Sequence, residues 1–412
     1  MTNAIKKYLV GGAVRDIIAG RKPKDYDYVV VGSTVQQMLD LGFEQVGKDF
    51  PTFLHPETKD EYALARTEKS CGIRHTDFVV NFDPEVTLEQ DLYRRDLTMN
   101  AIAYDDVNGV YIDPYGGAED IKNGVIRHVS EYFADDPLRM LRAARFAAQY
   151  AFSIHPDTMQ LMHGMVKKGM HLGLTIERVW QETVKAMATK TPSIYFNVLK
   201  ELGILEAYFP YVAKLSGVPQ PEQHHPEIDT YVHTMMVVDQ AAKSGDTLIV
   251  YAALVHDLGK GVTPVEEWPH HRGHEEAGVV LVEAMSNALR VPAIYKKAGV
   301  LSSRYHLDIH RAMDLNHKTL VDKLEALGAY RDPYLLQAVL TAGEADAKGR
   351  LGFEDKEYPQ RKYMSEAAQK LKELKFADLA EAYQGQRLLD AIRTRKVNAM
   401  KAFKREWNMG QE

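Results

Sequence analysis

Two aspartates stand two positions apart at the head of an apolar run. Asp25 and Asp27 come just before residues 28–31, and on a strand their carboxylates would point to the same face. Converging carboxylates can hold one or two Mg²⁺ ions together with substrate phosphates, which activates a hydroxyl nucleophile and stabilises a pyrophosphate leaving group. Surface turns also produce Asp-x-Asp, so the pair alone does not establish such a site.

A glycine pair precedes these aspartates. Gly11 and Gly12 follow a short apolar run and open a helical stretch that contains Arg15. Glycine lets a phosphate approach the backbone closely. A strand, a Gly-Gly turn, a helix and then a second strand with the aspartates form a far more specific pattern than either motif alone. This pattern predicts a nucleoside triphosphate held by magnesium, and Glu61, on the next predicted strand, is our candidate for a third carboxylate.

Arginines recur in two later motifs. Arg94 and Arg95 precede an apolar segment and would reach triphosphate oxygens, although a solvated face with an Arg–Asp pair fits equally well. Asp136, Arg139 and Arg142 share one helical face. There, a carboxylate would accept from the exocyclic amine of cytosine or adenine, and a guanidinium would donate to the adjacent ring nitrogen. The alternative is that Asp136 only caps a helix and the arginines are solvated.

A second group of residues suits a metal. His256 and Asp257 are adjacent at the end of an apolar helical segment, and His233 lies 23 residues earlier. Imidazole and carboxylate ligands in a helical bundle favour a divalent transition metal. His274 and His306 are weaker candidates, because an isolated histidine is commonly a surface residue.

Composition limits the class of protein. The chain has 412 residues, too many for one ordinary core, so we expect about two to four domains. Its net charge of −6 gives no overall attraction for nucleic acid, so a nucleic-acid-binding surface must be a local basic patch. The last helix, around 392–405, fits a patch of this kind and a solvated helix end equally well. The single cysteine, Cys71, excludes an internal disulfide, and we see no signal sequence and no apolar stretch of membrane length. We therefore expect a cytoplasmic protein.

The pattern of secondary structure changes along the chain. Up to about residue 130 it predicts an α+β mixture, and from Asp136 onward it is helical, with Pro137 at the first helical position and Asp136 as its cap. A proline-rich stretch at 216–229 indicates a boundary between a helical unit before it and one at about 231–331. The predicted strands are 8–10, 28–31, 62–65, 78–82 and 110–112, and the predicted helices include 13–19, 33–41, 86–103 and a last helical segment at 361–407.

The motifs occur in the order of a known family. GGAVRD, DYD, RRDLTMNA, DPYGG and DDPLRMLRAARF, followed by ERVWQE at 177–182, resemble the class II tRNA nucleotidyltransferases, the CCA-adding enzymes. The resemblance implies a polymerase-β-like head followed by an all-α neck, body and tail. It implies template-independent addition of C, C and A to the 3′ end of tRNA from CTP and ATP. The domains would be a nucleotidyltransferase head at 1–135, a base-recognising neck and body at 136–225, an HD domain at 230–331 and a helical tail at 332–412.

The matching motifs also imply site residues. Asp25 and Asp27 would be the catalytic carboxylates that hold Mg²⁺. The family's base-reading motif usually begins Glu-Asp, where this chain has Asp135 and Asp136. The residues implied to contact the nucleotide are Gly12, Arg15, Arg95, Asp136, Arg139, Arg142 and Arg145.

The histidine pattern, with WPHHRGH, resembles the HD-domain phosphohydrolases that some bacterial CCA-adding enzymes carry as a tail. The resemblance implies a second, metal-dependent activity on 2′,3′-cyclic phosphates, 2′-nucleotides and other phosphates, with Ni²⁺ one candidate metal. The most complete HD sites end in a distal aspartate, for which Asp308 and Asp346 are candidates. The residues implied at this site are His233, His256 and Asp257, and less strongly His274 and His306.

Two other functions compete with this interpretation. A bacterial poly(A) polymerase shares the head motifs but would make long A tails without using CTP; the chain length, the HD tail and the weakly basic C-terminus count against it. A non-catalytic RNA-binding or nucleotide-sensing module would not need intact Asp25, Asp27, His256 and Asp257. We therefore expect tRNA, CTP and ATP as partners, no membrane, and a monomer or homodimer.

Overall fold

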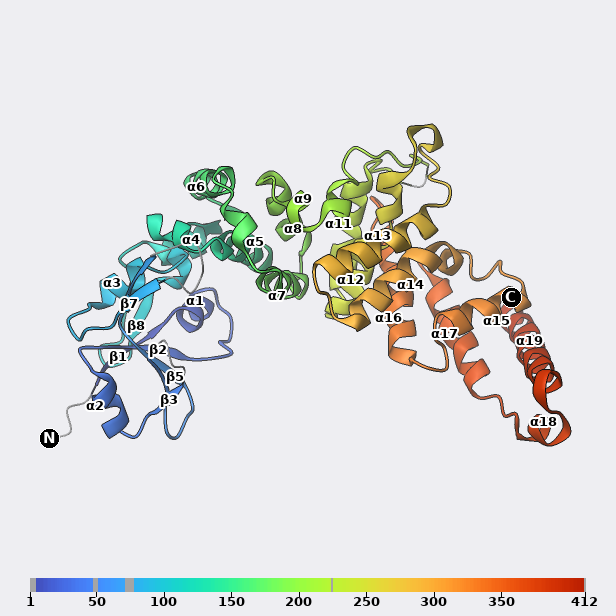
Figure 1. The fold of residues 1–412 in the computed structure, drawn as a ribbon, viewed down its shortest axis with the longest axis horizontal. Helices are drawn as coiled ribbons and strands as arrows, with labels where there is room; N and C mark the ends of the chain where they lie inside the picture. The colour runs from blue at the N-terminus through green and yellow to red at the C-terminus, as the bar shows by residue number, and fades with distance from the viewer. Residues whose placement is uncertain (1–4, 47–50, 71–77, 224, 411–412) are drawn as a thin grey trace. The chain divides into compact units, whose positions relative to one another are not determined.

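The computed structural model describes residues 5–46, 51–70, 78–223 and 225–410 (Figure 1). Cys71 lies outside the described residues. The chain divides into two compact units, one made of Met1–Glu182 with Glu201–Ile204 and the other of Thr183–Lys200 with Leu205–Glu412. Each unit is described by itself. No helix among the described residues is long and apolar enough to cross a membrane.

The first unit is built on a seven-stranded sheet of strand order β3-β4-β5-β2-β1-β8-β9. At its centre β1 (Lys6–Val10) runs antiparallel to β2 (Asp27–Val31), and β2 runs parallel to β5 (Glu61–Leu64) with Asp27 opposite Glu61. This register places two carboxylates side by side at the start of two strands. The other strands are β3 (Glu44–Val46), β4 (Thr52–Leu54), β8 (Ala103–Asp105) and β9 (Val110–Ile112), with separate pairs β6 (Thr67–Ser70)–β7 (Phe78–Asn81) and β10 (Val125–Ile126)–β11 (Ser153–Ile154).

Apolar residues cover both faces of this sheet. Successive residues of a strand point to opposite faces, and Val29 and Val30 accordingly belong to two different core clusters. Helix α3 (Leu88–Tyr93) contributes Leu88 and Leu92 to the first cluster, and α2 (Val35–Asp40) contributes Met38 to the second. The sheet is therefore a rigid base for residues at the ends of its central strands.

The turn between β1 and α1 (Gly12–Ile18) requires glycine. Gly11 has φ 66°, and a Cβ there would lie 3.0 Å from Nη1 of Arg95. An L-residue would be strained in this conformation and would also displace the guanidinium. The backbone of this turn therefore lies directly against an arginine of a later motif.

The five predicted strands each coincide with an observed strand, but one predicted helix is wrong. Instead of a single helix at 86–103, the chain forms α3, a 3₁₀ turn at Thr98–Asn100 and strand β8. Asp96 causes the break: its Oδ1 accepts hydrogen bonds from the backbone N of Leu97 and from Nδ2 of Asn100, both at 2.9 Å. Thr98 is also held by a residue outside the 3₁₀ turn, because its hydroxyl donates to Asp120 at 2.7 Å.

Helices form the rest of the first unit. They include α4 (Gly117–Asn123), α5 (Leu138–Tyr150), α6 (Pro156–Lys167) and the part of α7 (Ile176–Met187) that ends at Glu182. At the start of α5 the cap position falls on Pro137, one residue later than expected, while Oδ1 of Asp136 accepts from the backbone N of Leu138 at 3.0 Å. Asp136 thus supports the helix start and keeps its second carboxylate oxygen for another partner.

The second unit is all-helical. Its central helices α11 (Thr230–Ala242), α12 (Thr247–Val255), α13 (His274–Ala288), α14 (Ala293–His310) and α16 (Pro333–Lys348) pack on one another. Helix α12 is buried on every side from Leu248 to Val255, as expected for the middle of a bundle. The remaining helices are α8 (Ser193–Glu201), α9 (Leu205–Tyr208), α10 (Pro210–Ala213), α15 (His317–Ala326), α17 (Pro359–Lys372), α18 (Ala377–Ala382) and α19 (Gly385–Met409).

The bundle continues past the boundary expected at residue 331. Helix α16 begins at Pro333 and packs on α11, α12 and α14. Its buried face includes Leu336, Val339 and Leu340. We therefore assign α16 to this bundle rather than to a separate tail of 332–412.

The packing of α4 against the 3₁₀ turn gives a test of the fold. A Cβ on Gly117 would overlap the carbonyl oxygen of Thr98. We expect Gly117→Ala to lower the free energy of unfolding by about 1–3 kcal/mol, because the backbone must shift. The matched control Gly164→Ala, in α6 with open space around the new methyl group, should raise it by about 0.5–1 kcal/mol. Urea denaturation followed by circular dichroism measures both, and equal effects of the two variants would contradict the packing described.

Candidate active sites

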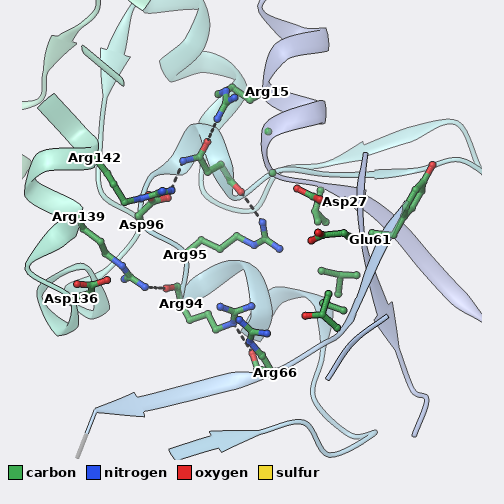
Figure 2. Close-up of a pocket in the computed structure, with 18 of the residues that line it drawn as sticks. Arg15, Asp27, Glu61, Arg66, Arg94, Arg95, Asp96, Asp136, Arg139 and Arg142 are labelled. Atoms are coloured by element: carbon green, nitrogen blue, oxygen red, sulfur yellow. Dashed lines mark hydrogen bonds and ion pairs between the residues drawn. The ribbon is translucent and has the colours of Figure 1, made fainter. Parts of the chain in front are cut away.

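A cavity of about 620 Å³ opens in the first unit beside the Gly-Gly turn (Figure 2). Gly11, Gly12 and Asn100 form part of its wall. Charged residues from motifs far apart in the sequence line it: within the described part of the chain these are the cations Arg15, Arg66, Arg94, Arg95, Arg139, Arg142 and Arg178 and the acids Asp27, Glu61, Asp96 and Asp136. An acidic chain has thus concentrated positive charge in one place, which suits an anionic ligand.

Two carboxylates face this positive charge. Figure 2 shows Asp27 and Glu61 side by side, with Arg95 extending toward them. Burial and the neighbouring charge of Glu61 raise the pKa of Asp27, while Arg95 opposes the shift. An all-oxygen donor pair whose members repel one another fits Mg²⁺, since a hard divalent cation removes the repulsion.

Asp25 lies differently from the expectation that it shares a strand with Asp27. Strand β2 begins at Asp27, and Asp25 is an exposed residue in the preceding loop that does not line the cavity. The loop at 21–26 contains lysines, a proline and Asp25, and strand pairing begins only at Asp27, opposite Glu61. Its charge still raises the pKa of Asp27, so the two carboxylates are close enough to interact electrostatically.

The adjacent arginines are held by one buried carboxylate. Asp91 accepts from Nη2 of Arg94 at 2.7 Å and from Nη2 of Arg95 at 3.0 Å. Burial alone would raise the pKa of Asp91, but the two guanidiniums lower it below its usual value. The arginines are therefore fixed and partly buried rather than solvated. Asp91 was not among the predicted site residues, although its spacing of three and four from the arginines on a helix is the signal that would identify it.

A polar chain joins three sequence motifs. Nη1 of Arg15 donates to Oδ1 of Asn100 at 2.7 Å, and Nδ2 of Asn100 donates to Asp96 at 2.9 Å. The other oxygen of Asp96 accepts from Nε of Arg142 at 2.8 Å. Asp96 is buried, yet Arg142 holds its pKa well below the usual range, and Asp96 in turn raises the pKa of Arg142. Arg15 also stacks on Phe146, with its guanidinium carbon 4.9 Å from the ring centre.

The expected base-reading pair borders the same cavity. Asp136 is 2.8 Å from Nη2 of Arg178, a residue of the ERVWQE motif that was not predicted at the site. Arg139 donates to the backbone carbonyls of Tyr132 at 2.7 Å and Arg94 at 3.0 Å. One oxygen of Asp136 therefore supports the helix start and the other contacts Arg178, and the base-reading role stays a prediction.

Arg145 is not brought to the cavity. Its guanidinium is buried and lies 2.6 Å from Oε2 of Glu182, with a further hydrogen bond to Gln149 at 3.0 Å. Arg145 lies about one helical turn after Arg142 on α5, in a stretch where residues 143–148 are all buried. Helical spacing alone does not distinguish a cavity-lining arginine from one that pairs inside the fold.

The second unit contains a buried cluster of histidines and aspartates. Around Asp257, the Nε2 atoms of His256, His274 and His306 lie 3.1, 3.3 and 3.4 Å from its carboxylate oxygens. His256 ends α12, whereas His274 and His306 come from α13 and α14. All the histidines predicted for this site, including the weaker candidates His274 and His306, are therefore brought together.

Asp346 lies in the same cluster. Its carboxylate is 3.1 Å from Nε2 of His233, 3.7 Å from Nε2 of His256 and 2.6 Å from Nε2 of His310. Asp308, the other candidate for the distal aspartate, instead pairs with Lys323 at 2.7 Å. Asp346 lies on α16, beyond the expected domain boundary, so only the packing of that helix shows that it belongs here.

The hydrogen bonds of these histidines fit metal binding. The Nδ1 atoms of His256, His274 and His306 face the carbonyls of Ala253, His271 and Ser303 at 2.7, 2.7 and 2.9 Å. A proton on each Nδ1 leaves each Nε2 as a lone pair, yet Nε2 of His274 lies 3.1 Å from Nε2 of His306. Nε2 of His256 and Oδ1 of Asp257 also have no hydrogen-bond partner among the described residues. A divalent cation between these atoms would satisfy all of them, and nitrogen with carboxylate ligands suits a transition metal.

The carboxylate of Glu227 contacts His233 on the Nδ1 side of its ring. Oε1 of Glu227 lies 2.9 Å from Nδ1 of His233 and 3.0 Å from Nδ1 of His225. A histidine that donates Nδ1–H to a carboxylate keeps Nε2 free and correctly oriented for a metal. Glu227 lies within the proline-rich stretch at 216–229 and was not predicted, because nothing in its local sequence indicates a distant histidine partner.

The basic C-terminal helix is partly neutralised within its own unit. On α19, Arg393 pairs with Asp322 at 2.8 Å and Lys396 with Glu325 at 2.7 Å. Lys404 donates to the backbone carbonyl of Met313 at 3.0 Å. Lys401 and Arg405 are exposed. A contact between this helix and tRNA therefore stays a prediction that rests on few cations.

Asp91 provides a test of the arginine arrangement. We expect Asp91→Asn to weaken binding of magnesium CTP about tenfold or more, because Arg94 and Arg95 lose the charge that orients them. Isothermal titration calorimetry measures the affinity, and circular dichroism checks the fold. Asp40→Asn, an exposed residue at the end of α2, is the matched control and should bind normally. Equal affinity of a folded Asp91→Asn variant and the wild type would contradict the role given to Asp91.

Glu227 provides a test of the metal site. We expect Glu227→Gln to lower the affinity for a divalent transition metal about 10–100-fold, because the amide holds His233 less firmly. Competition with a chromogenic chelator measures the affinity without any assay of turnover. Glu283→Gln, an exposed residue of α13, is the control. An unchanged metal affinity in the Glu227 variant would show that His233 needs no such support.

Comparison with family models agrees with the division into a head and a helical remainder. The model described as "Poly A polymerase head domain" matches residues 7–127. The model "Probable RNA and SrmB- binding site of polymerase A" matches 151–215, and the "HD domain" model matches 230–386. The HD match extends past residue 331, in agreement with the packing of α16.

Two curated relatives match nearly the whole chain. The multifunctional CCA protein of Hahella chejuensis is 47% identical over 407 residues, covering 98% of this chain and 96% of that protein. The multifunctional CCA protein of Thioalkalivibrio sulfidiphilus is 48% identical over 408 residues, covering 98% of this chain and 100% of that protein.

Solved structures share the fold at lower identity. The Bacillus stearothermophilus CCA-adding enzyme in complex with CTP has a TM-score of 0.67 at 23% identity, covering 99% of this chain and 94% of that one. The Thermotoga maritima CCA-adding enzyme complexed with tRNA has a TM-score of 0.58 at 19% identity, covering 99% and 92%. With relatives nearly half identical over their full lengths, this chain belongs to the family of multifunctional CCA proteins, the CCA-adding enzymes that carry an HD domain.

Proposed function

We propose that the arginine-lined cavity of the first unit is where this chain performs the family's nucleotidyl transfer. The reaction is the template-independent addition and repair of the 3′-terminal CCA of tRNA from CTP and ATP. The observation that carries the assignment is the meeting of Asp27 and Glu61 with the Gly-Gly turn and Arg95 in one cavity. A carboxylate pair suited to Mg²⁺, next to a backbone turn that a triphosphate can approach, supports this proposal.

Different residues would contact the metal, the phosphates and the ribose of the nucleotide. Asp27, with Glu61 beside it and Asp25 in the adjoining loop, would hold Mg²⁺, which when bound activates the 3′ hydroxyl of tRNA and neutralises the triphosphate. Gly12 keeps the backbone accessible to phosphate. Arg15, Arg95 and Arg142 would contact phosphate or ribose oxygens, with their orientations set by Asn100, Asp91 and Asp96.

Asp136 and Arg139 would read the base. Asp136 would accept from the exocyclic amine of cytosine or adenine, and Arg178, 2.8 Å from the carboxylate, would help to orient it. Arg139 would donate to the ring nitrogen beside that amine. Uracil and guanine present a carbonyl next to an N–H, so both contacts would fail and the base would be rejected. Arg145, originally expected to contact nucleotide, would instead support α5 through Glu182.

The histidine–aspartate cluster would carry a second activity, metal-dependent phosphohydrolysis. His233, His256, Asp257 and Asp346 would hold a divalent transition metal, with His274 and His306 extending the ligand set; Ni²⁺ is one candidate. The bound metal polarises a phosphate ester and lowers the pKa of a water nucleophile. The substrates we propose are 2′,3′-cyclic phosphates, 2′-nucleotides and other phosphomonoesters.

The proposal also covers the location of the protein in the cell, its oligomeric state and its domain bounds. We propose a cytoplasmic protein that acts as a monomer or homodimer, with a head at 1–135 and a neck and body at 136–225. The HD domain would extend from 230 through α16, instead of ending at 331, with the remaining helices as the tail. A poly(A) polymerase is the alternative for the head alone, because the matching head model bears that name.

Variants of the two sites test this assignment. We expect Asp27→Ala to reduce CTP incorporation into tRNA lacking CCA by about a thousandfold, because the metal loses its principal ligand, while metal-dependent phosphatase activity persists. His256→Ala should have the reciprocal effect and leave CTP incorporation intact. Radiolabelled CTP incorporation and release of inorganic phosphate measure the two activities on the same preparations. Survival of CTP incorporation in the Asp27 variant would overturn the assignment.

A further inference from the structure

A second cavity of the first unit, of about 460 Å³, is lined by three tyrosines. Tyr93 ends α3, Tyr115 lies between β9 and α4, and Tyr132 lies in the 3₁₀ turn at Glu131–Asp135. The ring centre of Tyr93 is 5.7 Å from that of Tyr115 and 5.6 Å from that of Tyr132, so the three rings form one group. The volume of this tyrosine-lined cavity is within the range of pockets that hold small organic ligands.

Two of these rings are not enclosed by the core. Tyr93 and Tyr132 are each 36% exposed, whereas Phe133, the next residue along the chain, is fully buried. The fold nevertheless fixes their surroundings, because the hydroxyl of Ser130 donates to the backbone carbonyl of Tyr93 at 3.0 Å. The hydroxyl of Tyr115 donates to the backbone carbonyl of Glu89, also at 3.0 Å. The cavity therefore has a preformed aromatic wall that a ligand can reach.

The charges of the lining favour a base over a phosphate. Among the lining residues there is one acid, Glu89, and one cation, Arg94. The guanidinium of Arg94 already faces the buried carboxylate of Asp91 at 2.7 Å. The tyrosine-lined cavity thus lacks the excess of positive charge found in the arginine-lined cavity. Aromatic rings with balanced charge suit a planar nucleobase.

The tyrosine-lined cavity adjoins the arginine-lined cavity. Arg94 lines both (Figure 2), and the adjacent residues Arg66 and Thr67 each line one of them. Arg139 connects the two walls, because it donates to the backbone carbonyl of Tyr132 at 2.7 Å and to that of Arg94 at 3.0 Å. Two ligands that share the Arg94 wall would lie next to each other, as consecutive nucleotides of a strand do.

We propose that the tyrosine-lined cavity holds the 3′-terminal base of the tRNA acceptor strand. Tyr93 and Tyr132 stack on this base, which places the attacking 3′ hydroxyl beside the triphosphate in the arginine-lined cavity. The terminal base changes during the reaction, from the base that precedes CCA to C. Stacking accepts every base, because each has a flat aromatic face. This inference rests on the nucleotidyl transfer proposed above.

Fluorescence of the RNA tests the contact in the full-length protein. The probe is a tRNA that ends before CCA and has 2-aminopurine as its last nucleotide, because stacking quenches the emission of this base. We expect the wild type to quench the emission in the absence of CTP. Tyr132→Ala should remove most of the quenching and raise KM for tRNA about fivefold or more, with KM for CTP unchanged. Tyr132→Phe keeps the flat ring and should behave as the wild type.

Two further variants separate stacking from packing. Tyr132→Leu keeps an apolar side chain but has no flat ring, so it should share the defect of Tyr132→Ala. Tyr111→Ala is the matched control, since Tyr111 is an exposed tyrosine of β9 that is not among the lining residues, and it should leave quenching and both KM values unchanged. Circular dichroism checks that each variant is folded.

Wild-type quenching and KM for tRNA in a folded Tyr132→Leu variant would overturn the inference. A raised KM for CTP with an unchanged KM for tRNA would also overturn it, because the rings would then hold the incoming nucleotide. If the wild-type protein itself does not add CTP to this tRNA, the proposed function fails first. That result is distinct from normal use of tRNA by the tyrosine variants.

Discussion

The nucleotide cavity depends on buried carboxylates that hold arginines in place before any phosphate is bound. Guanidiniums gathered around a cavity repel one another, and without countercharge they would swing toward solvent. Asp91 binds Arg94 and Arg95, and Asp96 binds Arg142, so each of these three guanidiniums is fixed by a carboxylate. Removing one buried partner leaves the other uncompensated, which makes these pairs more sensitive to substitution than surface ion pairs.

The same pairs connect residues far apart in the sequence. Asp96 breaks the helix expected at 86–103 and joins Asn100 to Arg142, while Asn100 joins Arg15 of the Gly-Gly motif. The Gly-Gly motif and helix α5 are thereby joined in one framework, because a shift of Asp96 would move both Asn100 and Arg142. The histidine–aspartate cluster of the second unit differs, because several histidine nitrogens and two carboxylates converge there.

Much of this could be predicted from the sequence, and the exceptions have physical causes. The five strands and the residues of the Gly-Gly, arginine and histidine motifs were identifiable because they depend on local patterns. The helix at 86–103 was wrong because a side chain, Asp96, competes with the backbone for hydrogen bonds. Arg145 follows the helical period of Arg142 but pairs with Glu182, and only tertiary packing distinguishes them. The sequence alone does not distinguish Asp346 and Arg178 as site residues among the other charged residues, because their partners lie 113 and 42 residues away.

The central claim is that one cavity accepts cytosine and adenine and adds them in order. Incubating tRNA that ends before CCA with CTP, ATP, UTP and GTP, singly and in combination, and sequencing the 3′ ends tests it most directly. The account predicts two added C residues with CTP alone, complete CCA with CTP and ATP together, and no extension with UTP or GTP. Long A tails with ATP alone and no use of CTP would contradict it.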